Sequence, residues 1–363
     1  MQRRNRLKAL VLTTLLGVLV LACAPAGGLR PAPPGQEAGG RTLTGAGSTF
    51  IYPIAAKWFD VYAQKTGVRI NYQSIGSGGG IRQLLDRTVD FGASDAPMTD
   101  EQLAQAPGKI LHIPMVLGAV VVSYNLPGLD GSLRLSPDTL AGIYLGEIRR
   151  WTDPRIAAEN PGLKLPDMPI AVVYRSDGSG TTYVFTDYLS AVSPAWKSRV
   201  GRGTSVSWPV GIGAKGNEGV TGQVKQTAGA VGYVELTYAI QNRLPYALLR
   251  NRDGNYVEPS LTNITAAAAG AAASMPEDLR VSIVNAPGPN SYPISAFTYI
   301  LAYQEQPDQA RGRALAEFLL WALDEGQKYA PDLHYAPLPD EVRARARARV
   351  KMMTYQGKPL LEN

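Results

Sequence analysis

Residues 68–94 read VRINYQSIGSGGGIRQLLDRTVDFGAS, and this stretch decides the fold class. Residues 68–76 alternate between apolar and polar side chains, which predicts a strand, and glycines then lead into the helical pattern of residues 79–88. The stretch at 89–94 predicts a second short strand. A strand, a helix and a strand in such close succession are typical of an α/β domain with a largely parallel sheet.

The same alternation continues on both sides of this stretch. Residues 50–65 place apolar side chains at helical spacing, and residues 110–126 form an apolar run that fits one or two buried strands. Asn217 is expected to be the N-cap of a helix at 216–229. With 363 residues the chain is long enough for two ordinary domains or one large one. The other expected helices are 136–146, 181–192 and 310–330, and the other expected strands are 42–48, 168–175, 230–236 and 291–303.

The first residues are typical of an exported protein. A basic head precedes an apolar run at residues 9–21. This run is shorter than the about 20 residues that a membrane-spanning helix needs, so we expect residues 1–22 to be a signal peptide. Cys23, the only cysteine, follows directly and resembles the lipidated cysteine of a bacterial lipobox, with ordinary cleavage nearby as the alternative. Residues 23–41 are rich in proline and glycine and predict a tether that carries the anchor.

Charge and composition argue against two other classes of protein. Four positive charges and no acids lie in residues 1–22, so the net charge of +6 falls to +2 without them. So balanced a chain is not expected to bind nucleic acid, which requires a persistent basic surface. With two histidines and one cysteine, a zinc or copper site is not expected either. We therefore expect neither a metal nor a cofactor.

Three stretches combine glycines with hydroxyl side chains: GAGSTF at 45–50, GSGGG at 76–80 and RSDGSGTT at 175–182. Each is expected between a strand and a helix, where unpaired N–H groups and the positive end of the helix dipole favour an anion. A single stretch of this kind is more often a simple N-cap, but three in one α/β protein indicate an anion site. The hydroxyl groups that could donate belong to Ser48, Thr49, Ser77, Ser179 and Thr181.

Enzymatic interpretations have weaker support. None of the three stretches completes the nucleotide loop G-x-x-x-x-G-K-[ST], and GSGGG lacks the second half of a dinucleotide fingerprint. A nucleophilic Ser179 would need a base, and the only histidines are His112 and His334. Because His112 lies in the apolar stretch ILHIPM, we expect it to be a buried strand residue rather than a catalytic base.

Three charged residues refine the anion interpretation. The planar guanidinium of Arg175 matches two oxygens of a tetrahedral oxyanion. Asp177 is near enough in sequence to pair with it, although a purely local salt bridge is the alternative. Asp95, in FGASDAP, would repel an anion unless that anion carries a proton that the carboxylate can accept. Phosphate at neutral pH has such a proton and sulfate does not, so Asp95 favours phosphate.

The stretch EVRARARARVKMM near the C-terminus predicts a helix. In it, Arg343 and Arg347, and likewise Arg345 and Arg349, become like-charged neighbours, which destabilises a helix unless acids or anions lie nearby. We expect a solvated terminal helix, with docking to a membrane partner as the alternative.

At these residues the sequence resembles the periplasmic phosphate-binding protein of the bacterial high-affinity phosphate ABC transporter. The resemblance covers essentially all of residues 42–340. The stretches that carry it are LTGAGSTF, AKWFDVYAQKTGVRINYQSIGSGGGIRQL, TVDFGASDAPM, LAGIYLGEIRRWTDP, SDGSGTTYVFTDYLS, WPVGIGAKGN, GAVGYVEL and YAPLPDEV.

The resemblance implies an α/β, two-lobed periplasmic-binding-protein fold similar to type II, in which each lobe is a mainly parallel sheet flanked by helices. Lobe 1 would comprise residues 42–124 plus 295–363 and lobe 2 residues 125–294, with hinge strands crossing near 124 and 294. Asp177 matches the family's partner of the binding arginine, and Tyr174 stands where some relatives carry another basic residue. The family's phosphate ligands correspond to Thr49, Phe50 (through its backbone N–H), Ser77, Asp95, Arg175, Ser179, Gly180 and Thr181.

The sequence therefore predicts a lipid-anchored receptor in the periplasm or on the outer face of the cytoplasmic membrane. It would bind inorganic phosphate, as HPO₄²⁻ or H₂PO₄⁻, in a cleft between the lobes and deliver it to an inner-membrane ABC permease. We expect a monomer without enzymatic activity. The alternatives are a receptor for another oxyanion such as sulfate or molybdate, a secreted phosphatase or hydrolase that uses Ser179, and an adhesin that has repurposed the fold.

Overall fold

The computed structural model describes residues 42–361, apart from the side chain of Ala272. The expected signal peptide (1–22), Cys23 and the expected tether (23–41) lie outside these residues, so their assignments stay predictions. Among the helices that the structure describes, none is both long enough and apolar enough to span a membrane.

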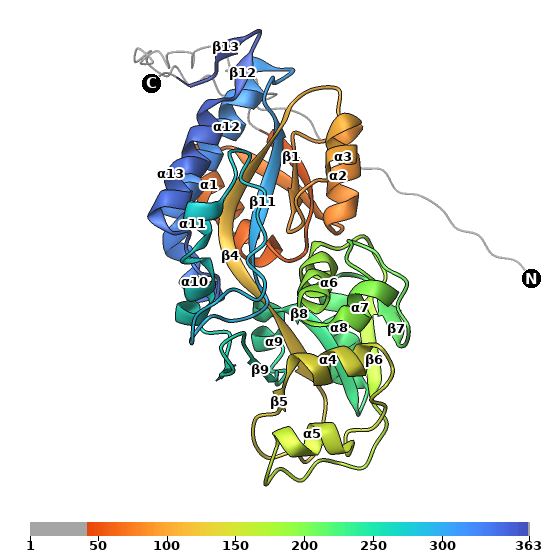
Figure 1. Ribbon diagram of the computed structural model, residues 1–363. Coiled ribbons are helices and arrows are strands. Elements are labelled where there is room, and N and C mark those ends of the chain that lie inside the picture. Colours follow the sequence, from red (N-terminus) through yellow and green to blue (C-terminus); the bar gives the residue numbers. More distant parts are fainter. Residues whose placement is uncertain (1–41, 362–363) are drawn as a thin grey trace, which may run out of the picture. The chain divides into compact units, whose positions relative to one another are not determined.

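One sheet of eight strands organises the described chain, with the strand order β2-β1-β3-β11-β4-β8-β6-β7 (Figure 1). The strands β2, β1 and β3 at one end are parallel, and so are β8, β6 and β7 at the other. The two strands between these groups, β11 and β4, pair in antiparallel fashion with their neighbours. The bounds are β1 (Thr42–Gly47), β2 (Arg69–Ser74), β3 (Phe91–Ser94), β4 (Ile110–Tyr124), β6 (Ala171–Arg175), β7 (Ile212–Ala214), β8 (Ala230–Glu235) and β11 (Ser295–Tyr303).

The long strand β4 joins the two parallel groups. It is buried at every position, as a strand covered on both faces must be. The apolar run at 110–126 predicted one or two buried strands, and the structure has one. Up to Ala119 it pairs with β11, and from Val120 to Tyr124 it pairs with β8. In Figure 1 it runs from the orange and blue part of the molecule into the green part. One continuous strand therefore connects the segments that carry the predicted site residues.

Helices flank the sheet, and the predicted fold class is confirmed. The smaller strands are β5 (Arg134–Leu135), β9 (Leu248–Arg250), β10 (Tyr256–Val257), β12 (Thr354–Tyr355) and β13 (Lys358–Pro359). The helices are α1 (Tyr52–Thr66), α2 (Ser77–Leu85), α3 (Asp100–Ala104), α4 (Pro137–Tyr144), α5 (Pro154–Glu159), α6 (Gly180–Val192), α7 (Pro194–Arg199), α8 (Gly216–Gln226), α9 (Leu236–Gln241), α10 (Leu261–Ala268), α11 (Ala271–Ser274), α12 (Gln309–Leu323) and α13 (Asp340–Lys351).

Two helices differ from the sequence-based prediction. The helix expected over 310–330 ends at Leu323, and a 3₁₀ turn at Glu325–Tyr329 follows it. Bonds from distant residues hold this turn: Trp58 Nε1 donates to the carbonyl of Gly326 at 2.8 Å. The assignment of Asn217 as an N-cap was wrong, because α8 already begins at Gly216. The side chain of Asn217 bonds to other elements instead.

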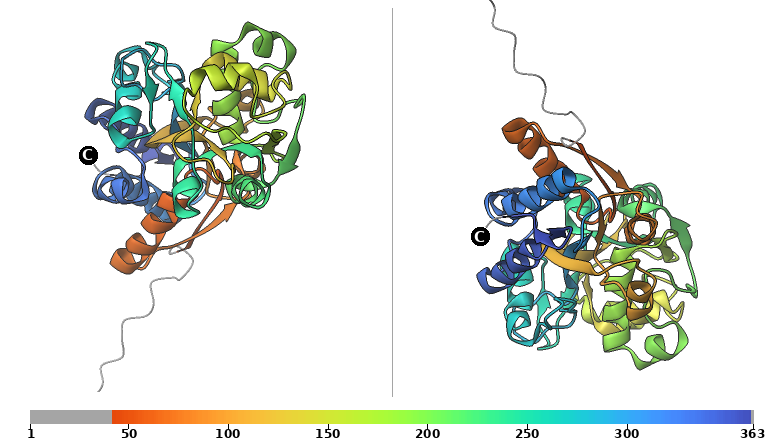
Figure 2. Two further views of the ribbon diagram at one scale, coloured as in Figure 1. Left: turned by 90° about the horizontal axis from the view of Figure 1, so that it is seen from below. Right: turned by 90° about the horizontal axis from the view of Figure 1, so that it is seen from above.

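The arginine-rich stretch is helical, as predicted, and its arginines contact other parts of the chain. Arg345 donates to the carbonyls of Met275 (2.9 Å) and Pro276 (2.7 Å), and Arg349 donates to that of Glu277. Arg347 pairs with Asp324, the residue after α12. In Figure 2 the two blue helices α12 and α13 lie side by side, away from the green helices α6 and α7. These acceptors offset the repulsion between the like-charged arginines of α13. Contacts within the chain therefore explain why this helix can carry so many arginines.

Candidate functional site

Two of the three glycine–hydroxyl stretches meet directly, although they are far apart in sequence. As predicted, both stretches lie where a strand leads into a helix: GSGGG follows β2 and forms the first turn of α2, and RSDGSGTT runs from the end of β6 into the first turn of α6. The N–H of Gly180 donates to Ser77 Oγ at 3.0 Å, and the N–H of Gly78 donates to the carbonyl of Gly178 at 2.9 Å. The start of α6 therefore faces the start of α2, so the positive ends of two helix dipoles converge.

The glycines permit this close approach. A Cβ atom on Gly180 would clash with Asp95 Oδ2 and Ser77 Oγ, and a Cβ on Gly76 would lie 2.7 Å from the carbonyl oxygen of Gly178. Gly76 also has a φ of +85°, which side chains rarely adopt. Both positions thus exclude any larger residue.

The third stretch, GAGSTF between β1 and α1, joins the same cluster through Asn217. Asn217 Nδ2 donates to Thr49 Oγ1 at 2.8 Å and to Thr181 Oγ1 at 3.1 Å. Thr49 is 2% exposed, and Thr181 and Asn217 are fully buried. Three strand–helix junctions that the sequence suggested separately therefore form one buried polar cluster.

Asp95 lies in this cluster with 3% of its surface exposed. Ser48 Oγ donates to it, lying 2.7 Å from Oδ1 and 2.8 Å from Oδ2, and Thr298 Oγ1 donates to Oδ1 at 2.9 Å. Burial raises the pKa of Asp95 to about 6, against the lowering effect of these hydroxyls and of Arg175. The carboxylate is therefore ionised at neutral pH and can accept a further proton or hydrogen bond.

Arg175 is also 3% exposed, and the pairing with Asp177 exists as predicted. Nε donates to Asp177 Oδ1 at 2.7 Å and Nη2 donates to Oδ2 at 2.5 Å, while Nη1 donates to Thr181 Oγ1 at 3.3 Å. Burial alone would raise the pKa of Asp177, but the bonds from Arg175 outweigh it and hold that pKa below its usual value. These contacts use three of the five N–H donors of the guanidinium and fix its plane.

A group of stacked aromatic side chains packs next to Arg175 and contacts its backbone. Its backbone N–H donates to the hydroxyl of Tyr233 at 3.0 Å. The Tyr233 ring stacks on Phe185 (4.4 Å between centroids) and on Trp208 (5.6 Å), and Trp208 stacks in turn on Tyr174 at 5.1 Å. Some members of the family that this sequence resembles carry a basic residue at the position of Tyr174. In this chain the position contributes aromatic packing instead of charge.

The hydroxyl and backbone donors of the cluster have several partners already. Ser179 caps α6, because its Oγ accepts the N–H of Thr182 at 3.0 Å; its own proton can still be donated. The N–H of Phe50 donates to Ser48 Oγ at 2.9 Å. All eight predicted ligand residues and Asp177 thus belong to the buried polar cluster. The backbone N–H of Phe50, which was predicted to donate to the ligand, donates to Ser48 in this structure.

Sequence reasoning missed the contributions of Thr298 and Asn217 to the cluster, and also the acceptor of Ser48. Thr298 lies on β11 and Asn217 on α8, and both reach the cluster only through tertiary contacts. Asn217 had one indirect signal, since it ends the stretch WPVGIGAKGN that carries the family resemblance. Ser48 was noted as a donor hydroxyl, but nothing in the sequence indicated that Asp95 would be its acceptor.

His112 is not available as a base for Ser179. It is 2% exposed on β4, and its Nε2 accepts the N–H of Met98 at 3.0 Å. Burial lowers its pKa to about 4. The expectation of a buried strand residue is confirmed. Among the described residues, no group of three or more histidine, cysteine, aspartate or glutamate side chains could hold a metal ion.

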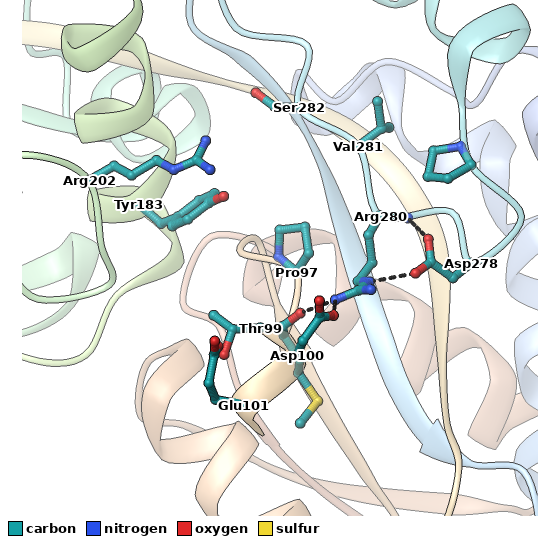
Figure 3. Close-up of a pocket in the computed structure, with 12 residues that line it drawn as sticks. Pro97, Thr99, Asp100, Glu101, Tyr183, Arg202, Asp278, Arg280, Val281 and Ser282 are labelled. Atoms are coloured by element: carbon teal, nitrogen blue, oxygen red, sulfur yellow. Dashed lines mark hydrogen bonds and ion pairs between the residues drawn. The ribbon is translucent and has the colours of Figure 1, made fainter. Parts of the chain in front are cut away.

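A cavity of about 550 Å³ is lined by residues outside the cluster (Figure 3). It lies between the loop that follows Asp95 and the first turns of α6, with Tyr183 and Arg202 on the α6 side. Arg280 lies opposite and is paired with Asp100 (2.8 Å) and Asp278 (2.7 Å). Because Asp100 and Asp278 pair with Arg280, and Asp187 pairs with Arg202 at 2.7 Å, these arginines do not concentrate positive charge in the cavity.

Glu235, at the end of β8, is fully buried below the cluster. Its Oε2 accepts the N–H of Thr237 at 2.9 Å, and its Oε1 lies 3.1 Å from Thr237 Oγ1. Burial raises the pKa of Glu235 to about 8, although the bonds from Thr237 oppose this shift. The carboxyl is therefore protonated at neutral pH and, like a glutamine amide, offers one donor and one acceptor.

We expect Glu235→Gln to make the folded protein less sensitive to alkali. A carboxyl whose folded pKa is raised stabilises the fold below its unfolded pKa, and this contribution is lost as the pH rises through about 8. The variant should match the native free energy of unfolding at pH 5 and exceed it by a few kcal/mol at pH 9. Urea unfolding at both pH values measures this, with exposed Glu258→Gln as the control. Parallel pH profiles for native protein and variant would contradict it.

Comparison with known proteins agrees with the geometry. Residues 32–325 match the family model described as PBP superfamily domain. The chain is 48% identical over 298 residues to the phosphate-binding protein PstS of Xylella fastidiosa strain 9a5c, covering 82% of this chain and 81% of that protein. It is 46% identical over 323 residues to PstS of Pasteurella multocida strain Pm70, covering 88% of this chain and 93% of that protein.

Two solved structures are similar in fold. One is a high-affinity periplasmic phosphate-binding protein, PfluDING, bound with phosphate at pH 8.5; its TM-score is 0.70 at 24% identity, covering 85% of this chain and 93% of the other. The other is a putative phosphate ABC transporter substrate-binding protein with bound phosphate from Clostridium perfringens, with a TM-score of 0.61 at 17% identity, covering 82% and 100%. At these identities the likeness concerns the two-lobed fold.

Proposed function

Because this chain belongs to the PBP superfamily and, within it, to the phosphate-binding proteins named PstS, we propose that it is an extracytoplasmic receptor that binds inorganic phosphate for an ABC transporter. The observation that carries the proposal is Asp95: a buried carboxylate that faces converging helix N-termini and the guanidinium of Arg175. This arrangement suits an anion that still carries a proton.

In this proposal, the eight residues predicted from the family resemblance hold the phosphate. Backbone N–H groups, hydroxyls and the fork of Arg175 donate to its oxygens, and Asp95 accepts its proton. The N–H of Phe50 would be shared between phosphate and Ser48 Oγ, from which it is 2.9 Å away. Sulfate has no proton for Asp95 at neutral pH, so the same carboxylate would repel it.

The proposal includes two lobes, 42–124 plus 295–363 and 125–294, which close on the ligand. The change of partner along β4, from β11 to β8 between Ala119 and Val120, supports a hinge in this strand. Ser77 and Asp95 would lie on the first lobe, and Arg175 and Thr181 on the second. A ligand that bonds to both lobes binds the closed form more tightly and thereby shifts the balance toward it.

We further propose that the receptor acts as a monomer, performs no chemistry and hands phosphate to an inner-membrane permease. Two contacts support the proposal that the protein is not an enzyme. The Oγ of Ser179 caps α6, and Nε2 of His112, the candidate base, already accepts a bond from Met98. A lipid on Cys23 would hold the protein at the membrane, with residues 23–41 as the tether.

Calorimetric titration of the purified protein with phosphate, arsenate and sulfate at pH 7.5 tests this function. Phosphate and arsenate should bind and compete, since they share shape and proton, whereas sulfate should bind far more weakly. Sulfate as tight as phosphate would assign the site to another oxyanion. Steady hydrolysis of a phosphate ester, lost in Ser179→Ala, would indicate an enzyme instead.

A further inference from the structure

Asn217 is the one amide that contacts two of the predicted ligands, as far as the described residues show. It lies in the first turn of α8 and is fully buried. Its Oδ1 accepts the backbone N–H of Glu235 at 3.0 Å. Because an N–H group can only donate, this bond identifies the oxygen of the amide and leaves Nδ2 facing Thr49 and Thr181.

Both threonine oxygens therefore act as acceptors. Thr49 Oγ1 accepts Asn217 Nδ2 at 2.8 Å and the N–H of the same residue at 3.3 Å. Thr181 Oγ1 accepts Asn217 Nδ2 at 3.1 Å and Arg175 Nη1 at 3.3 Å. A hydroxyl has two acceptor sites and one proton. Since N–H donors occupy the acceptor sites of both threonines, each proton is left to donate elsewhere.

We infer that Asn217 is a positioning residue that turns the hydroxyl protons of Thr49 and Thr181 toward a bound oxyanion. The inference deepens the proposed function and rests on it. A hydroxyl that rotates freely must be ordered when the ligand binds, and this cost reduces the binding free energy. A hydroxyl whose oxygen already accepts two hydrogen bonds is pre-organised as a donor. Asn217 also joins the segments after β1 and at the start of α6, so both hydroxyls are oriented together only when these segments meet.

Asn217→Asp tests the orientation directly, because a carboxylate accepts where the amide donates. The threonine hydroxyls can rotate and donate to the new carboxylate, so the variant keeps its local bonds while the ligand loses two donors. At pH 8.5 we expect phosphate affinity to fall about 50-fold, in keeping with lost hydrogen bonds to a charged group and added repulsion. As the pH falls to 5, the new carboxyl takes up a proton and can donate again, so the ratio of variant to native Kd should shrink to about 5-fold.

The measurement is phosphate calorimetry at several pH values on the native and variant proteins. Ionisable groups around the position affect both proteins and largely cancel in the ratio. They are Asp95, Arg175, Asp177, Lys215, Glu218, Glu235 and Tyr238. Asn251→Asp is the matched control, since Asn251 is also a buried amide, with 4% exposure, but it donates to the carbonyls of Gly288, Pro289 and Ser291. It should leave the phosphate affinity and its pH profile unchanged.

A ratio that stays constant between pH 5 and pH 8.5, or an unchanged affinity at pH 8.5, would overturn the inference. Native protein that binds no phosphate at any pH would overturn the proposed function and the inference with it. A second variant keeps the test decisive if Asn217→Asp folds poorly. Asn217→Ala should cost about 10-fold in the native background and clearly less beside Thr49→Val, because both changes remove the same oriented donor. Additive losses would contradict an action through Thr49.

Discussion

Replacing Arg175 by alanine is expected to weaken phosphate binding at pH 7.5 by at least about 1,000-fold, or about 4 kcal/mol. The guanidinium is 3% exposed and is held flat by Asp177 and Thr181, so it is pre-organised for an oxyanion. Its removal eliminates charge-assisted hydrogen bonds and leaves the mostly buried Asp177 carboxylate without its partner. Both effects act against an anionic ligand, which explains the size of the expected loss.

Two further variants separate these effects in the same calorimetric titration. Arg175→Ala combined with Asp177→Ala removes the unpaired carboxylate and should recover part of the affinity. Arg150→Ala is the matched control, because Arg150 also makes a two-bond pair with an aspartate, Asp167, but at the exposed surface. It should leave the phosphate affinity unchanged. If Arg175→Ala stayed within 10-fold of the native protein, Arg175 would not be a ligand.

The elements of this fold were predictable where they depend on local sequence. The helix at 50–65, the strand–helix junctions at the three glycine stretches and the capping Ser179 all follow from periodicity or from residues close in the chain. The 3₁₀ turn that follows α12 was not predictable, because it is bonded by Trp58, which lies 268 residues from its acceptor Gly326. Local propensity carries no information about such a contact.

The candidate site shows the same division. Arg175 and Asp177 are two residues apart, so their pairing could be anticipated from chemistry alone. The bond from Thr298 to Asp95 spans 203 residues, and that from Asn217 to Thr49 spans 168. These residues are ordinary threonine and asparagine in sequence, and only the sheet order β3-β11-β4-β8 brings them to the cluster. The family resemblance supplied the predicted ligands, but not Thr298 and Asn217, which contact them.

Asp95→Asn is expected to raise sulfate affinity at pH 7.5 by at least about 100-fold and to weaken phosphate binding less than Arg175→Ala does. Two like charges about 4 Å apart near a protein surface repel by about 4 kcal/mol, and the amide removes this repulsion from a fully ionised anion. For phosphate the amide oxygen still accepts the ligand's proton, although one of the hydroxyls of Ser48 and Thr298 must turn to accept from the new NH₂ group. The variant should therefore lose most of its discrimination between the two anions.

The pH dependence of sulfate binding distinguishes this explanation from a general loosening of the site. The pKa of Asp95, raised by burial, is about 6, so native protein should gain sulfate affinity as the pH falls through this value and the carboxyl becomes neutral. Asp95→Asn has no such group at this position and should bind sulfate with nearly the same affinity at pH 5 and pH 7.5. Asp90→Asn is the matched control, because Asp90 is a mostly buried carboxylate that pairs with Arg311 outside the site. Unchanged sulfate affinity in Asp95→Asn, or a native profile without a step near pH 6, would mean that discrimination arises from the donors and not from the proton that Asp95 accepts.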